Sequence, residues 1–315
     1  MGFRKKDEEE YKSSGVHYKQ SFGDRIISII TYIVYSIFAF VCVYPFYYIF
    51  INSISSNQLS ERGKVIFIPL EVHFSNYASV MKIDGLFQAA KVSLGRTLVG
   101  TAIAVFTSAF LGYMFTRESM WARKFWFRVV AATMYFNAGI IPLYITITNL
   151  HLLNNFWVYV LPMAISPFYL ILCKTFVESV PKELQDAAMI DGAGTLRIFF
   201  SIMIPVIKPI LATVAIFTAV NQWNAFQDTL LYITDKKLYT LQFVLYQYIN
   251  QASSIKALLN GSSGSANIAA SMAKMQTATS IRMTVTIVVV APILLVYPFF
   301  QRYFTKGIMI GAVKG

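Results

Sequence analysis

Six long runs of uncharged residues alternate with charged segments along the chain. They cover residues 26–60, 97–116, 129–150, 152–173, 209–227 and 283–301, and each contains at least 19 residues. A helix needs about 20 mostly apolar residues to cross the hydrocarbon core of a membrane. The pattern therefore predicts an all-α integral membrane protein with six transmembrane helices.

The composition agrees with this prediction. The chain has 315 residues, of which 56% are hydrophobic and 13% are charged, and its mean hydropathy is +0.56. Soluble domains carry about 25% charged residues. The first 25 residues are polar and contain no apolar core of a signal peptide, so we expect the first span to remain as an anchor.

Lysine and arginine positions predict the orientation. With a cytoplasmic N-terminus, the cytoplasmic segments carry 17 of the 27 basic residues. Cytoplasmic loops are enriched in these residues, so we expect cytoplasmic tails over 1–25 and 302–315 around a transmembrane domain over 26–301. Because the positive charges lie at span ends, the net charge of +12 indicates topology and attraction to anionic membrane lipid, and no nucleic-acid partner is expected.

One cytoplasmic segment, residues 174–208, has the sequence of a soluble helix. Pro181 suits the first turn of a helix, and Glu183 and Asp186 place negative charge near its positive end. A short helix is expected to begin there. Four residues spaced i, i+3, i+4 and i+7 would form one face of small groups, which allows another backbone to approach closely. They are Leu184, Ala187, Ala188 and Asp191.

The same segment contains signals for a turn and a second helix. Gly192 and Gly194 permit a sharp turn, and Thr195 is expected to cap the next helix. Pro205 and Pro209 are expected to end that helix before the fifth span. The predicted shape is a helix, a turn and a helix lying on the inner face of the membrane. An amphipathic hairpin that only links two spans fits the same pattern.

The sequence PKELQDAAMIDGAGTLRIFFSIMIPVIKP, residues 181–209, resembles the Glu-Ala-Ala loop of permease subunits in binding-protein-dependent ABC importers. The matching parts are Asp186-Ala187-Ala188, Asp191-Gly192-Ala193 and the Ile202 to Pro205 ending. The stretches YPFYYIFINSIS, KLYTLQFVLYQYI and QRYFTKGIMIGAVKG resemble the carbohydrate branch, close to the maltose-permease G-subunit type and the LplC-type polysaccharide permeases. The resemblance covers the chain from about Asp24 onward.

This resemblance implies the type I permease fold of ABC importers, with a coupling loop over 178–205 that docks on a cytoplasmic ATPase subunit. The family usually has Glu where this chain has Asp186, which is one methylene shorter, so Glu183 is expected to share its role. The resemblance also implies contacts of the C-terminal tail at Gly311 and Lys314. It assigns ATPase coupling to Glu183, Asp186, Ala187, Ala188, Asp191, Gly192 and Ala193.

The resemblance further implies a second homologous permease, two ATPase subunits, a carbohydrate solute, and an extracytoplasmic solute-binding protein that docks on the outer segments 52–96 and 233–282. The sequence contains no G-x-x-x-x-G-K-[ST] phosphate loop, so ATP and Mg are expected on the ATPase subunits. Its scattered Cys and His residues give no metal-ligand spacing, and no cofactor or catalytic residue is expected. The expected location is the bacterial cytoplasmic membrane.

Two other classes compete with this interpretation. A secondary transporter or channel for a small polar solute usually has ionisable residues within its spans, and the six uncharged runs contain none. A membrane-embedded enzyme would need paired carboxylates or histidine clusters in the spans. The sequence thus favours a transport subunit that depends on an ATPase partner.

A polar cluster at the outer end of the fifth run is the candidate solute path. Amides and an aromatic plane suit the hydroxyl groups and C–H faces of a sugar. Asn224, Gln227 and Asp228 are spaced i, i+3 and i+4, which predicts one shared helical face. Amides also form hydrogen bonds between helices, and that interpretation predicts no solute contact. The cluster comprises Asn221, Gln222, Trp223, Asn224, Gln227 and Asp228.

Overall fold

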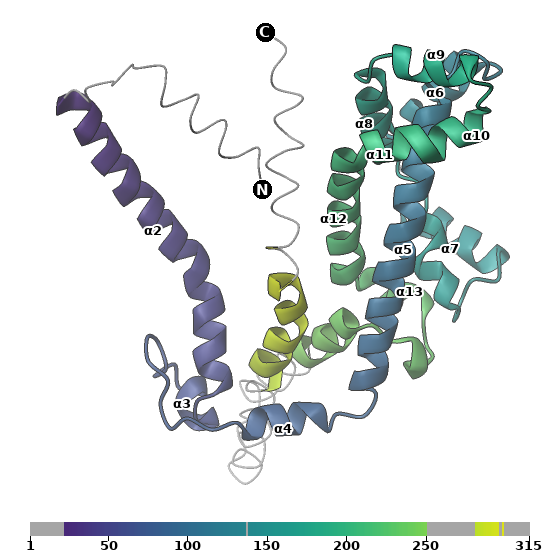
Figure 1. The fold of residues 1–315 in the computed structure, drawn as a ribbon. Coiled ribbons are helices and arrows are strands. Elements are labelled where there is room, and N and C mark those ends of the chain that lie inside the picture. Colours follow the sequence, from purple (N-terminus) through teal and green to yellow (C-terminus); the bar gives the residue numbers. More distant parts are fainter. Residues whose placement is uncertain (1–21, 137, 251–280, 296–297, 299–315) are drawn as a thin grey trace. The chain divides into compact units, whose positions relative to one another are not determined.

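The computed structural model describes residues 22–136, 138–250, 281–295 and 298, and these form helices and irregular segments without a strand (Figure 1). The chain divides into two compact units, Met1–Ile49 and Phe50–Gly315. Gly311 and Lys314, with the rest of the predicted C-terminal tail, lie outside the described residues. Most of the predicted N-terminal tail also lies outside them.

The first unit contains most of helix α2 (Phe22–Ser53), a continuous apolar helix of 32 residues. Its side chains up to Ile49 are almost all exposed. Phe40, Tyr44 and Tyr48 follow one another at spacing i, i+4 and i+8, with ring centroids 5.9 and 6.2 Å apart. A long helix with so many exposed apolar side chains requires lipid or protein around it.

Helix α5 (Leu86–Met114) is the main axis of the second unit. Helices α8 (Pro167–Glu178) and α12 (Lys208–Asn224) pack along it (Figure 1). Glycines on α5 permit this close packing. A Cβ at Gly100 would lie 2.6 Å from Nε2 of Gln222 on α12, and a Cβ at Gly112 would lie 2.9 Å from Cβ of Cys173 on α8.

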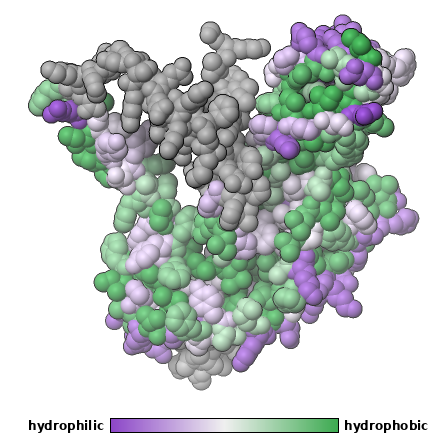
Figure 2. All heavy atoms as spheres, viewed as in Figure 1, coloured by the Kyte–Doolittle hydropathy of each residue, from purple (hydrophilic) through white to green (hydrophobic). Residues whose placement is uncertain are grey.

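The remaining elements of the second unit are short. In Figure 2, hydrophilic residues gather at the end of this unit that carries α9 and α10, and hydrophobic residues cover much of the neighbouring length. This distribution is typical of a protein surrounded by lipid. The short elements are α3 (Asn57–Glu61), α4 (Ser75–Met81), α6 (Arg123–Thr133), α7 (Ile140–Asn149), η1 (Phe156–Tyr159), η2 (Leu161–Met163), α9 (Glu183–Ile190), α10 (Thr195–Ile198), η3 (Phe199–Met203), α11 (Ile204–Val206), α13 (Gln227–Tyr232), η4 (Lys236–Leu238) and helices over 241–250 and 281–295.

Each of the six predicted runs contains helix, but few of the runs are single helices. Among the described residues, α2 and α5 are long and apolar enough to cross a membrane alone, by length and composition. Two bent pairs would raise this number to four: Phe156–Met163 with Pro167–Glu178, bent by 48°, and Thr195–Val206 with Lys208–Asn224, bent by 80°. The count of six spans and the N-in, C-in orientation remain predictions.

Backbone signals explain two of the breaks. The run 129–150 divides between α6 and α7, and Gly139 at the start of α7 has a φ of +82°, which only glycine adopts readily. The run 152–173 divides before Pro167. Ser166 there is extended, at φ −107° and ψ 116°, because the ring of a proline disfavours helical geometry at the preceding residue.

Candidate coupling segment and polar node

The short helix predicted within residues 174–208 is confirmed as α9. It begins at Glu183, and the carbonyl of Lys182 accepts hydrogen bonds from the backbone N–H groups of Gln185 and Asp186 at 2.9 and 3.0 Å. Glu183 and Asp186 lie in its first turn. Negative charge there stabilises the helix, because the unpaired N–H groups make this end positive.

The predicted turn is also confirmed, and its hydrogen bonds follow the Schellman pattern. The N–H of Ala193 donates to the carbonyl of Ala188 at 2.9 Å, and the N–H of Gly192 donates to the carbonyl of Met189 at 3.0 Å. Gly192 has a φ of +79°. Ala188 and Ala193 both pack into the same hydrophobic core. Glycine is favoured at such a position because a Cβ would clash there with the backbone.

The second helix differs from the prediction at its start. Gly194 is the residue before the helix, and Thr195 is the first helical residue, with no side-chain cap among the described contacts. Thr195 therefore does not cap the helix. The prediction failed because Gly194 already takes the extended conformation of a cap, at φ −70° and ψ 163°.

The end of the second helix also differs. Pro205 does not end it but lies within α11, and Pro209 lies in the first turn of α12. The turn before Pro205 is a π-helix over Phe199–Met203, in which the N–H of Ile204 donates to the carbonyl of Phe199. Proline lacks an N–H and its ring clashes with the carbonyl four residues earlier, so a wider turn at this point relieves the clash.

The two faces of α9 have different environments. Gln185 and Ala188 are buried, and Ala188 belongs to the hydrophobic core around α8 and the π-helix. Leu184, Ala187 and Asp191 are exposed. The predicted four-residue face is therefore wrong at Ala188, which points inward to complete the turn with Ala193. Of the seven predicted coupling residues, the exposed ones are Glu183, Asp186, Ala187, Asp191 and Gly192.

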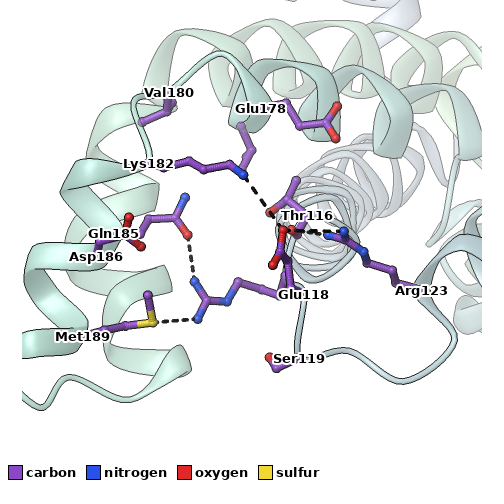
Figure 3. Close-up of a pocket in the computed structure, with 12 residues that line it drawn as sticks. Thr116, Glu118, Ser119, Arg123, Glu178, Val180, Lys182, Gln185, Asp186 and Met189 are labelled. Atoms are coloured by element: carbon purple, nitrogen blue, oxygen red, sulfur yellow. Dashed lines mark hydrogen bonds and ion pairs between the residues drawn. The ribbon is translucent and has the colours of Figure 1, made fainter.

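The inner side of α9 borders a pocket that the sequence did not indicate. Its volume is about 700 Å³, and it lies between α9 and the segment that follows α5 (Figure 3). Arg117 from that segment donates a hydrogen bond from Nη1 to Oε1 of Gln185 at 3.0 Å and one from Nη2 to Sδ of Met189 at 3.2 Å. In sequence, Arg117 marked only the end of an apolar run. Asp186 also lines the pocket.

A second polar assembly, which we call the polar node, surrounds Arg96 on α5. Arg96 is fully buried and forms an ion pair with Asp228, with Nη2 and Oδ2 at 2.5 Å and Nη1 and Oδ1 at 3.1 Å. Nε and Nη2 donate to Oε1 of Gln222 at 3.1 and 3.0 Å, and Nη1 donates to the carbonyl of Ala225 at 3.2 Å. Two parallel bonds to one carboxylate form the strongest arrangement for this pair.

Tyr159 on η1 connects the polar node to neighbouring segments. The guanidinium of Arg96 lies over its ring at 4.5 Å from the centroid, a favourable cation–π distance. The carbonyl of Tyr159 accepts a hydrogen bond from Nε2 of Gln222 at 3.2 Å, and the hydroxyl of Tyr159 donates one to the carbonyl of Leu238 at 2.7 Å. The hydroxyl of Thr229 donates to Oη of Tyr159 at 3.1 Å. The node thus joins α5, η1, α12 and α13.

The node overturns two expectations. Arg96 is the eleventh of 29 residues in α5, so the expectation that charges only bound the apolar helices is wrong for this helix. The predicted shared face of Asn224, Gln227 and Asp228 is also wrong, because α12 ends at Asn224 and α13 begins at Gln227. Ala225 between them is extended, with ψ at 132°.

The candidate solute residues therefore separate into two groups. Gln222 and Asp228 are held by Arg96 in the polar node. Asn221 and Asn224 are exposed; Nδ2 of Asn221 donates to Oη of Tyr169 at 3.3 Å, and Oδ1 of Asn224 accepts from Nε2 of Gln242 at 3.1 Å.

The last two candidates differ from both groups. Nε1 of Trp223 donates to the carbonyl of Val289 at 3.0 Å, and Gln227 is exposed. In the described part of the chain, no group of three or more His, Cys, Asp or Glu side chains could hold a metal ion.

Comparison with known proteins places the chain in a family. Residues 100–310 match the family described as binding-protein-dependent transport system inner membrane component. The chain is 33% identical to the polygalacturonan/rhamnogalacturonan transport system permease protein YtcP of Bacillus subtilis (strain 168), over 93% of this chain and 99% of that protein. It is 35% identical to protein LplC of the same organism, over 87% and 90%.

A solved structure gives the same result. One chain in the crystal structure of a bacterial ABC transporter involved in the import of the acidic polysaccharide alginate matches with a TM-score of 0.78 and 27% identity, over 90% of this chain and 98% of that chain. The resemblance found in the Glu-Ala-Ala loop is thereby confirmed. The chain belongs to the family of binding-protein-dependent transport system inner membrane components, the permease subunits of ABC importers.

Proposed function

We propose that this chain is the permease subunit of an ATP-driven importer that moves a carbohydrate, either an oligosaccharide or a fragment of a polysaccharide, into a bacterial cell. The observation that carries the proposal is α9, an exposed helix with an acidic first turn, placed at one end of the packed helices α5, α8 and α12. The carbohydrate class is supported by relatives named for polygalacturonan/rhamnogalacturonan and for arabinooligosaccharides.

The proposed assembly contains a second homologous permease, two cytoplasmic ATPase subunits that bind ATP and Mg, and an extracytoplasmic solute-binding protein. This chain would cross the cytoplasmic membrane six times with both termini inside. Closure of the ATPase subunits would displace α9 and tilt the spans between inward-facing and outward-facing states. Such a change requires that α9 and its partner make different contacts in the two states.

The proposed contact surface for the ATPase is the exposed side of α9 and its turn. Ala187 offers a small group for close approach, and Glu183, Asp186 and Asp191 offer carboxylates for basic side chains. Gly192 contributes through its backbone geometry, since it fixes the turn. The buried Ala188 and the partly buried Ala193 would act by holding α9 on the core.

For the solute path we propose Asn221 and Asn224. Both amides are exposed, and each has a polar partner from another helix, Tyr169 for Asn221 and Gln242 for Asn224. An amide and a phenol side by side can bind sugar hydroxyls as donor and acceptor. Gln222 and Asp228 would act indirectly, because their side-chain oxygen atoms are engaged by Arg96 and Nε2 of Gln222 by the carbonyl of Tyr159.

Reconstitution of the complete transporter in proteoliposomes tests this function. Solute delivered by the binding protein is expected to stimulate ATP hydrolysis and to enter the vesicles only when ATP is supplied. A secondary transporter, the alternative class, would accumulate solute with an ion gradient alone. Uptake without ATP and without ATPase subunits would refute the proposal.

Two matched variants localise the coupling. Gly192→Val places a β-branched residue at φ +79°, where such residues are strongly disfavoured, whereas Gly194→Val places it at φ −70°, and neither site has an atom within 4 Å of the added Cβ. The first is expected to lower solute-stimulated hydrolysis about tenfold, within the usual range of coupling energies. The second should retain it. Equal activity of both variants would show that the turn does not transmit the signal.

A further inference from the structure

A coupling helix can transmit a displacement only if it is held to the spans that must move. The backbone reaches α9 from α8 and leaves it towards α12, but α5, which packs against both of these helices, is not adjacent to α9 along the chain. A side-chain contact must therefore link α5 to α9 if a displacement of α9 is to move α5. This requirement rests on the proposed function, in which α9 is the coupling helix.

Arg117 supplies a direct connection. It follows the last turn of α5, where its N–H donates to the carbonyl of Met114 at 3.0 Å, so its backbone is fixed to that helix. Its guanidinium lies over the ring of Tyr113 on α5 at 5.9 Å from the centroid. From there the side chain reaches Gln185 and Met189, which are one turn apart on the inner side of α9. In Figure 3, the dashed lines that end at Gln185 and at Met189 mark these two contacts.

A further polar contact across this pocket, between Lys182 and Glu118, is weak by comparison. Nζ of Lys182 and Oε1 of Glu118 are 4.0 Å apart, and both side chains are about four-fifths exposed, at 81% and 79%. Exposed ion pairs of this kind contribute little, because water screens them and both side chains lose freedom. Arg117 is part-buried at its bond to Gln185, so that hydrogen bond is less exposed to competing water.

The environment of Arg117 also leaves room for movement. The pocket of about 700 Å³ lies between α9 and the segment after α5. Nε of Arg117 is buried and has no acceptor within the part of the chain that the structure describes. Met189 contributes a flexible thioether, which adapts its contacts easily. A long cationic side chain with partners on a flexible surface can keep its contact while the two elements shift.

We propose that Arg117 is a positioning residue that ties α9 to α5, so that a displacement of the coupling helix moves this span. The role follows from three features: a backbone anchored on α5, two side-chain contacts on one face of α9, and a pocket that allows the contact to change length. Nothing in the Glu-Ala-Ala sequence itself identifies this residue, since it lies 69 positions before Asp186.

The test uses the complete transporter with Arg117→Met, which keeps an extended side chain but removes the donors to Gln185. The matched control is Arg123→Met. Arg123 lines the same pocket, but its Nη1 donates to the carbonyl of Thr116 at 2.8 Å, and no contact with α9 is found among the described residues. Arg117→Lys, which keeps the charge and one donor group, is the conservative variant.

Two measurements follow. The first is hydrogen exchange of the α9 amides in the assembled complex, which does not depend on transport. The second is the number of solute molecules transported per ATP hydrolysed. Arg117→Met is expected to speed exchange in α9 and to lower the transport ratio about fivefold or more, at the lower end of usual coupling effects. Arg117→Lys should lie between this variant and the parent, and Arg123→Met should match the parent.

The outcomes separate this proposal from the proposed function. Unchanged exchange and an unchanged ratio in Arg117→Met overturn the tie, as does an equal loss in Arg123→Met, which would indicate a general effect on the pocket. If the parent complex shows no solute-stimulated hydrolysis, the proposed function fails, and hydrogen exchange alone decides whether Arg117 holds α9. If Arg117→Met does not assemble, the intermediate values expected of Arg117→Lys provide the test.

Discussion

Two arginines, one within α5 and one just after it, lie in opposite environments. Arg96, the eleventh residue of α5, is fully buried, and its polar partners are a carboxylate, an amide and a backbone carbonyl. Arg117, three residues after the end of α5, is partly exposed, its partners are an amide and a thioether, and one of its nitrogen atoms has no acceptor in the described part of the chain. The first arginine therefore has a full set of polar partners in a buried site, whereas the second can change its contacts more easily.

This difference has an energetic reason. A buried charge is tolerated only when its partners are complete, so the polar node can hold α5, η1, α12 and α13 in one arrangement but cannot open cheaply. A half-exposed arginine keeps part of its hydration and loses little when a contact changes. We infer that the node keeps its helices together as a rigid group, while movement concentrates at the α9 end.

The largest effect on stability is expected at the buried ion pair of Arg96 and Asp228. Asp228→Ala leaves Arg96 buried without its carboxylate and is expected to destabilise the protein by about 3–5 kcal/mol, the usual cost of breaking a buried ion pair. Thermal unfolding of the purified protein in detergent measures this loss. Glu178→Gln is the control, since its ion pair with Lys174 has nearly the same length, 2.6 Å, but lies at the surface.

The control should lose less than about 1 kcal/mol, as exposed pairs do. Combining Asp228→Leu with Arg96→Met removes both charges and is expected to restore much of the lost stability, because no uncompensated charge remains. A small effect of Asp228→Ala, equal to that of Glu178→Gln, would show that the buried ion pair stabilises the protein no more than an exposed one.

The sequence predicted the coupling segment better than the polar node, for physical reasons. The start of α9 and its turn depend on local signals, the acidic first turn and Gly192, which act over a few residues. Pro181, which was expected in the first turn, lies before the cap residue Lys182 instead. The bond between Arg96 and Asp228 joins positions 132 apart, and no periodicity reports such a contact. Arg96 was assigned to a segment outside the spans because a charge normally ends an apolar run.

The two faces of α9 could also not be read from spacing alone. The pattern of small residues is compatible with either face, and the choice depends on the turn, which directs Ala188 inward to meet Ala193. The π-helix before Pro205 was missed for a similar reason. Proline predicted an interruption at this position, but the wider turn keeps the chain helical, and the ring of Phe199 packs against those of Phe110 and Tyr113 on α5.

An intermediate loss of stability is expected between the two arginines, at the point where α5 packs against α8. Gly112→Ala adds a Cβ 2.9 Å from Cβ of Cys173 and 3.0 Å from the backbone nitrogen of Lys174. Because backbone cannot move aside easily, a loss of about 1–3 kcal/mol is expected, as for other overpacked sites. Gly95→Ala on the same helix meets only ordinary contacts at 3.7 Å, and its thermal unfolding should remain close to that of the parent.

The smallest effect on stability is expected at Arg117. Arg117→Met removes a hydrogen bond to a neutral amide and a weak, exposed one to a thioether, and it is expected to cost about 1 kcal/mol or less. The same thermal unfolding assay measures this change. Together with its effect on coupling, a small stability loss would show that Arg117 acts in transmission more than in folding. A loss of stability as large as that of Asp228→Ala would contradict the proposed difference between Arg96 and Arg117.

The central claim is that the exposed side of α9 contacts an ATPase subunit, and neighbouring residues on this helix test it directly. Cys42 and Cys173 are first replaced, since both are free thiols. A cysteine is then placed at Ala187, which is exposed, or at Ala188, which is buried, and a thiol-to-amine cross-linker is added to the assembled transporter. Ala187→Cys is expected to cross-link to the ATPase subunit in high yield and Ala188→Cys weakly. Equal yields at both positions, or no cross-link at Ala187→Cys in a complex that hydrolyses ATP, would contradict the account.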